Sequence, residues 1–174
     1  YYRAHFADDA QWTNYTVTIF DDEADQAPFI AITGGSAGGG TSSSQTVTYP
    51  AGTTFDVVTN PQDGVDYSDL TAGGAVPLIE VRGRGDDRLA DNFQVKELDA
   101  SDGARYARIS VDLMERLQRL RDRVGGPLHV VSGYRHPALN ASVDGAERSQ
   151  HMAGRAADIR SNDLTPLELA ELAL

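Results

Sequence analysis

Cysteine is absent from the 174 residues, which excludes disulfide bonds and thiolate metal ligands. Apolar runs are short, and none approaches the roughly 18 residues that a membrane-spanning helix needs. Lysine is almost absent as well, since Lys96 is the only one. The chain has no stripe of basic residues to meet phosphate groups, so the sequence argues against nucleic acid as a partner. What remains is a globular chain whose 40% of hydrophobic residues suffices for a buried core.

Negative charge dominates the chain, with 26 acidic against 15 basic residues and a net charge of −11. The excess lies in residues 1–80, which hold eleven acidic residues and one basic residue, Arg3, whereas residues 81–174 are nearly balanced. This break predicts two domains, an acidic β-rich module over residues 1–82 and a second domain over 83–174. An acidic, lysine-poor surface suits high salt, because screening weakens its self-repulsion. We therefore hypothesise a halophilic source, with a GC-rich genome that favours arginine as the alternative.

The first module has the pattern of β-structure. Tyr15, Val17 and Ile19 alternate with polar residues. The same composition predicts strands over residues 13–20, 29–33, 45–49, 53–59 and 76–81. The acidic run 21–25 lacks the spacing of a calcium-binding EF-hand loop and is interpreted as a solvated loop. The glycine-rich run 34–40 lacks the ending of a phosphate-binding loop and is interpreted as a hairpin loop. These elements predict a small all-β module.

The second module mixes helices and strands. Apolar residues at spacings of 4, 4, 3 and 4 form one helical stripe, made of Ile109, Leu113, Leu117, Leu120 and Val124. Ser110 suits the N-cap of this helix, and Gly125 suits its end. A buried strand is predicted over residues 127–131. The segment 165–168 has the spacing of a capping box, with proline at the first helical position of a final helix. The second module is therefore predicted to be α+β.

Two polar motifs follow the predicted strand. The first is S-G-Y-R at 132–135, and the second is S-x-H-x-x-G-x-A-x-D at 149–158. The second motif separates His151 from Asp158 by seven residues, with Gly154 between them to let the backbone turn. Imidazole and carboxylate both bind zinc, and a planar guanidinium suits a carboxylate. Each residue also has a structural alternative: the histidine as a hydrogen-bonding group, the aspartate as a turn cap, and the arginine as the partner of a surface carboxylate.

Taken in order, these motifs resemble the zinc D-Ala-D-Ala carboxypeptidase family, whose members cut the peptide stems of bacterial cell walls. The features that carry the resemblance are N-F-x-V-x-E-L at 92–98, the amphipathic helix, S-G-Y-R at 132–135, Asn140 with Gly145, and the motif at 149–158. The resemblance covers about residues 92–174. It implies an α+β peptidase-like domain with a zinc cofactor, held by His151 and Asp158. It also implies a catalytic role for Arg135, which would hold the substrate's carboxylate or polarised carbonyl, and substrate contacts from Ser149 and His136.

The family pattern also calls for a third zinc ligand on a later strand, preceded by an acidic residue that activates water. Only sixteen residues follow Asp158, and none of them is a histidine. The helix predicted at the end of the chain is also short. We therefore expect the chain to be a fragment whose α+β domain is incomplete at its C-terminus, which leaves enzymatic activity undecided by the sequence.

Two functions follow from these observations. In the first, the protein is a zinc metallopeptidase of D-Ala-D-Ala carboxypeptidase or endopeptidase type that acts on peptidoglycan peptides. In the second, it is a catalytically incomplete assembly protein of a filament, virion tail or envelope, whose partners are other copies of itself. Both predict an extracellular, cell-envelope or virion-associated location.

Overall fold

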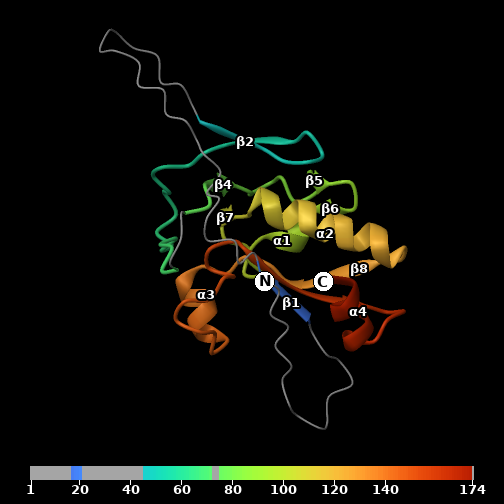
Figure 1. Cartoon of the computed structure of the whole chain (residues 1–174). Coiled ribbons are helices and arrows are strands. Elements are labelled where there is room, and N and C mark those ends of the chain that lie inside the picture. The colour runs from blue at the N-terminus through green and yellow to red at the C-terminus, as the bar shows by residue number, and fades with distance from the viewer. Residues whose placement is uncertain (1–16, 21–44, 72–74, 174) are drawn as a thin grey trace.

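Figure 1 shows the computed structural model of the chain, which describes residues 17–20, 45–71 and 75–173. The strand predicted at 29–33 and the two runs predicted as loops, 21–25 and 34–40, lie outside the described residues. The all-β character of the whole first module therefore stays a prediction.

The described residues form small antiparallel sheets and four helices. In chain order they are β1 (Val17–Phe20), β2 (Thr46–Thr48), β3 (Thr54–Asp56), β4 (Leu78–Glu80), β5 (Arg88–Ala90), β6 (Phe93–Gln94), α1 (Val95–Leu98), β7 (Tyr106–Arg108), α2 (Val111–Val124), β8 (Leu128–Ser132), α3 (Pro137–Ser142), β9 (Ala156–Ser161) and α4 (Pro166–Ala173). β9 is the middle strand of a three-stranded sheet in the order β1-β9-β8, and the remaining strands pair as β2-β3, β4-β7 and β5-β6. The predicted α+β class is confirmed.

Helix α2 has the ends and the buried face that its sequence predicts. Ser110 Oγ accepts a hydrogen bond from Leu113 N at 3.4 Å, and Gly125 ends the helix in the left-handed conformation, with φ 66°. The buried face consists of Leu113, Met114, Leu117 and Leu120. Each such side chain contributes roughly 1.5–3 kcal/mol when it is fully buried. In Figure 1, α2 lies between the β5–β6 hairpin and β8, so this face closes the core above the sheet.

Strand β8 is less buried than predicted. It runs from Leu128 to Ser132, and of its residues only Leu128 is fully buried, while Val131 is 55% exposed. The strand predicted over residues 127–131 is therefore present, but the prediction that it is buried was wrong. The physical reason is the place of β8 in its sheet: among the described residues β9 is its one strand neighbour, and alternate side chains of β8 face outward.

One core extends across the position where we expect the boundary between modules. Strand β4 pairs with β7, although the two strands lie on opposite sides of residue 82. The Tyr49 hydroxyl donates to Ile109 O at 2.8 Å, and Ala51 N donates to Leu89 O at 3.2 Å. The described residues on both sides of residue 82 therefore share one packed interior. The division into modules itself stays a prediction.

The final helix begins with the expected capping box. Thr165 N donates to Glu168 Oε2 at 2.8 Å, and Glu168 N donates to Thr165 Oγ1 at 3.3 Å. Leu169 lies on the inner face of α4, and its side chain is buried in the core. In the part of the chain that the structure describes, no helix has both the length and the apolar character needed to cross a bilayer.

Candidate functional site

The two polar motifs meet where β8 ends beside β9. Ser132 is the register partner of Asp158, and an irregularity in the pairing lies between Val130 and Ser132. Past the end of β8, the backbone N–H of Arg135 donates to His151 O at 3.2 Å. Segments that are sixteen or more residues apart in sequence are thereby held side by side, and their polar side chains face a common point.

Tyr134 and Gly133 fix the first motif to α1. Tyr134 N donates to Leu98 O at 2.8 Å, and its ring is 2% exposed, so burial raises the pKa of its hydroxyl. A Cβ on Gly133 would lie 2.4 Å from Leu98 O, a distance that side-chain carbons do not reach. Only glycine lets the strand exit pass so close to α1. The tyrosine of the motif is thus structural, and it anchors the turn that presents Arg135.

Gly154 has a matching role in the second motif. Its φ is +71°, and a Cβ there would lie 2.2 Å from Arg108 O. Its own carbonyl accepts from Ser110 N at 2.9 Å, which joins the turn to the start of α2. The sharp turn predicted at this glycine is confirmed. It returns the chain from His151 into β9, so that Asp158 comes back towards the imidazole.

His151 and Asp158 form a close pair with a defined tautomer. His151 Nδ1 lies 2.7 Å from Gly133 O, and since a carbonyl only accepts, this nitrogen carries the proton. The other ring nitrogen, Nε2, lies 3.4 Å from Asp158 Oδ1. In neutral histidine Nε2 is then an acceptor that faces another acceptor. A proton on Nε2 or a cation between the two atoms would make this contact favourable.

Zinc fits this pair in donor type and spacing. Zinc bonds of about 2.0–2.2 Å in tetrahedral geometry separate neighbouring ligand atoms by roughly 3.4 Å. The bond from His151 Nδ1 to a backbone carbonyl is also the outer contact that orients zinc-binding histidines. Within residues 17–20, 45–71 and 75–173, no group of three or more metal-ligating side chains occurs. The binding of zinc by His151 and Asp158 therefore stays a prediction.

Arg135 forms an ion pair with the second oxygen of the Asp158 carboxylate. Its Nη2 donates to Asp158 Oδ2 at 2.8 Å and its Nε donates to Ser132 Oγ at 2.9 Å. The two charged side chains are 17% and 16% exposed, so this ion pair is largely shielded from solvent. The Asp158 carboxylate thus contacts Arg135 through Oδ2 and His151 through Oδ1. The guanidinium has five N–H donors, and these contacts use two of them.

His136 and Ser149 are engaged by the protein. His136 Nδ1 accepts from Leu139 N at 3.3 Å as the N-cap of α3, and its Nε2 lies 2.7 Å from Asp102 Oδ2. Its ring is buried, at 5% exposure. Ser149 Oγ accepts from His151 N at 3.4 Å and so stabilises the turn before the imidazole. The substrate contacts predicted for both residues stay predictions.

Sequence reasoning missed Asp102, which holds the ring of His136 directly after the first motif. Asp102 precedes a glycine in a turn-like S-D-G segment, a pattern too common to single out. Its contact with His136 spans 34 residues. No pattern in the local sequence predicts that Asp102 and His136 come into contact.

The comparison with known families agrees with the motifs. The family model described as Peptidase M15 matches residues 89–173. This makes the second half of the chain a metallopeptidase-like hydrolase domain. Residues 89–173 therefore form an M15-like peptidase domain, in agreement with the resemblance in the sequence. No curated protein and no solved structure matches the chain.

Proposed function

We propose that the protein is a zinc peptidase of the M15 type that acts on peptidoglycan peptide stems, as a D-Ala-D-Ala carboxypeptidase or endopeptidase. The observation that carries the proposal is the 3.4 Å separation of His151 Nε2 and Asp158 Oδ1, with Arg135 on the other carboxylate oxygen. This action on a wall polymer also requires an extracellular or cell-envelope location.

Each residue has a defined task in this proposal. His151 and Asp158 hold the metal, and zinc supplies a Lewis acid that polarises the scissile carbonyl and activates water. Arg135 keeps the Asp158 carboxylate oriented and offers its remaining N–H groups to the carboxylate or carbonyl of the peptide. A third ligand and an acid–base residue have to come from outside the described residues or from another chain.

Zinc titration calorimetry of the full chain at neutral pH tests the metal site. We expect binding that weakens at least tenfold in His151→Ala and in Asp158→Asn, since each substitution removes a ligand from the zinc. His129→Ala is the matched control, because this half-buried histidine lies against Asn162, away from the pair. Equal zinc affinity in the protein and in all three variants would remove the basis of the proposal.

Binding and cleavage of synthetic peptides test the proposed substrate. We expect the zinc-loaded protein to bind a peptide ending in D-Ala-D-Ala more tightly than the same peptide with an amidated C-terminus, because Arg135 pairs with the free carboxylate. Arg135→Lys keeps the charge but loses the planar fork and should lower this preference. Mass spectrometry of the products identifies the bond that is cut.

A second candidate, a non-catalytic assembly role, is favoured by the edge strand β8. Its outer edge has no strand neighbour among the described residues, and Val131 is 55% exposed on it. Such an edge can pair with another copy. Sedimentation over a range of concentrations would then show oligomers that Val131→Lys dissociates, whereas a concentration-independent monomer excludes this role.

A further inference from the structure

Arg135 stands between two buried residues that face away from the candidate site. Tyr134 and His136 are 2% and 5% exposed, whereas Arg135 itself is half-buried. The backbone at His136 is extended, with φ −71° and ψ 163°, and successive side chains of an extended chain point in opposite directions. Burial of the two neighbours on one side therefore directs Arg135 to the other side, where its Nη2 donates to Asp158 Oδ2 at 2.8 Å.

Both neighbours of Arg135 are attached to residues 98–102, the segment at the end of α1. Tyr134 N donates to Leu98 O at 2.8 Å, and the imidazole Nε2 of His136 lies 2.7 Å from Asp102 Oδ2. The first bond joins two backbone groups and does not depend on side-chain identity. The second bond depends on a single carboxylate, so a substitution of Asp102 can remove it.

The contact between His136 and Asp102 is a hydrogen bond with a fixed direction. His136 Nδ1 accepts from Leu139 N at 3.3 Å, so the proton of the ring lies on Nε2. Nε2 then donates to the carboxylate, and such a charge-assisted bond is stronger than one between neutral groups. Asp102 Oδ1 accepts from Ala104 N at 3.2 Å, which orients the carboxylate within its own turn. The ring of His136 is thus held at both nitrogens.

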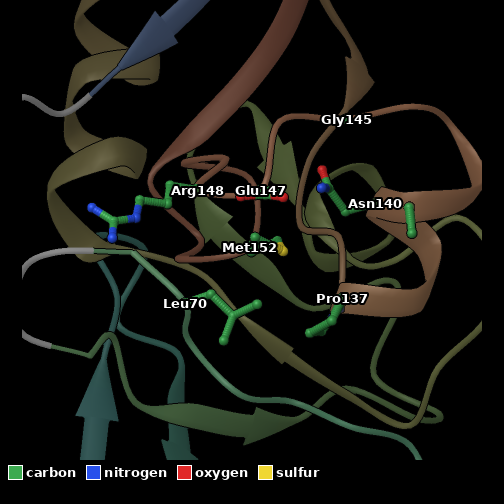
Figure 2. A pocket seen from close by; sticks show the side chains of 8 residues that line it. Leu70, Pro137, Asn140, Gly145, Glu147, Arg148 and Met152 are labelled. Atoms are coloured by element: carbon green, nitrogen blue, oxygen red, sulfur yellow. The ribbon is translucent and has the colours of Figure 1, made fainter.

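Side-chain packing restrains the other side of this turn less. Helix α3 begins at Pro137, directly after His136, and a hollow of about 450 Å³ separates it from Met152. Figure 2 shows Pro137 and Asn140 on the α3 side of this hollow and Met152 across from them. Because a hollow provides no packing contacts, the direction in which the chain leaves Arg135 depends on the hydrogen bonds at His136.

We infer that Asp102 is a positioning residue, which keeps the Arg135 guanidinium directed at the candidate site through the bond between its carboxylate and His136. Asp102 acts through the ring of His136 and not by contact with a substrate. That this positioning serves the recognition of a peptide's C-terminal carboxylate rests on the proposed function. The positioning of the guanidinium itself does not.

The first experiment measures how firmly the Arg135 side chain is held. It follows Nε–H groups by ¹H–¹⁵N NMR in the full chain, with a chelator present to remove metal. Arg135 Nε donates to Ser132 Oγ at 2.9 Å, and Arg84 Nε, the internal reference, donates to Asp87 Oδ2 at 2.7 Å. The loss of one resonance in Arg135→Lys and of another in Arg84→Lys assigns both. The exchange of each Nε–H with water reports how often its hydrogen bond opens.

The variants separate positioning from general stability. Asp102→Ala should speed the exchange at Arg135 about threefold to tenfold and leave Arg84 unchanged, because a charge-assisted bond is lost only beside the motif. His136→Asn should have the same effect, since asparagine still caps α3 but is too short to reach Asp102. The double variant should exchange no faster than the faster single variant, because both changes break the same bond. Asp122→Ala, the matched control, loses a 2.9 Å side-chain hydrogen bond on the exposed face of α2 and should change neither rate.

Four results would each overturn the inference. They are an unchanged rate at Arg135 in Asp102→Ala, an equal acceleration at Arg84, additive effects in the double variant, and the same effect in Asp122→Ala. The side chain of Asp102 is 43% exposed, so the chain should still fold when it is truncated.

The second experiment connects the position of Arg135 to the substrate. The zinc-loaded protein and its variants are compared in their binding of a peptide ending in D-Ala-D-Ala and of the same peptide with an amidated C-terminus. We expect Asp102→Ala to lower the preference for the free carboxylate about threefold to tenfold, and Asp122→Ala to keep it. A full preference in Asp102→Ala contradicts the role in substrate recognition while the proposed function stands. If the unaltered protein binds neither peptide, the proposed function fails, and the exchange rates still decide whether Asp102 positions Arg135.

Discussion

Replacing Gly154 by alanine tests how the second motif is built. A left-handed φ of +71° costs a side chain about 1–2 kcal/mol, and the new Cβ would lie 2.2 Å from Arg108 O, part of the backbone. Relieving such an overlap costs about 1–3 kcal/mol more, and the reduced freedom of the unfolded chain returns about 0.4–1 kcal/mol. The free energy of unfolding should therefore fall by about 2–4 kcal/mol, or roughly 5–15 °C in Tm.

Gly103→Ala is the matched control for this change. Gly103 has nearly the same φ, +77°, but nothing lies within 4 Å of its Cβ position. It should lose only about 0.5–1 kcal/mol, since the backbone cost remains and the clash does not occur. Thermal unfolding followed by circular dichroism compares the two variants. Equal losses of stability would refute the argument that contact with Arg108 is what requires glycine in the motif.

Two further predictions concern the ion pair and the buried tyrosines. With a chelator present to remove metal, Arg135→Gln should lower the free energy of unfolding by about 2–3 kcal/mol, and by much less when Asp158→Asn is already present. Urea unfolding of the two single variants and the double variant should therefore give a coupling energy of about 1–2 kcal/mol between the two residues. Additive losses would contradict the pairing. Burial raises the pKa of Tyr49, Tyr67 and Tyr134 above the ordinary 10.0, so these hydroxyls keep their protons in the folded state while the unfolded chain ionises, and stability should fall as pH rises past 10. An alkaline absorbance titration checks this, and titration of every tyrosine near pH 10 in the folded protein would contradict it.

Local sequence signals predicted much of the second domain. The apolar stripe of α2 and its capping residues, Ser110 and Gly125, are features of the local sequence, and the structure contains both. The capping box of α4 is equally local. The pairing of His151 with Asp158 was also foreseen, because a glycine turn between two ligand types constrains where both can lie.

Long-range contacts account for what the sequence did not predict. His136 was expected to contact substrate, yet Asp102 holds its ring from 34 residues away. The edge position of β8 depends on which other strands join the sheet, and the sequence of residues 127–131 cannot predict that strand order. The packing of Tyr49 on Ile109 likewise joins residues 60 apart.

The antiparallel pairing of β4 with β7 has a practical consequence for anyone who trims this chain. A segment cut at residue 83 would leave β7 with an open edge and would uncover the apolar faces that Tyr49, Phe55 and Ile79 occupy. Expression of the peptidase-like half alone should yield aggregates. A shorter soluble version should also keep β1, which pairs with β9, and should therefore start no later than residue 17.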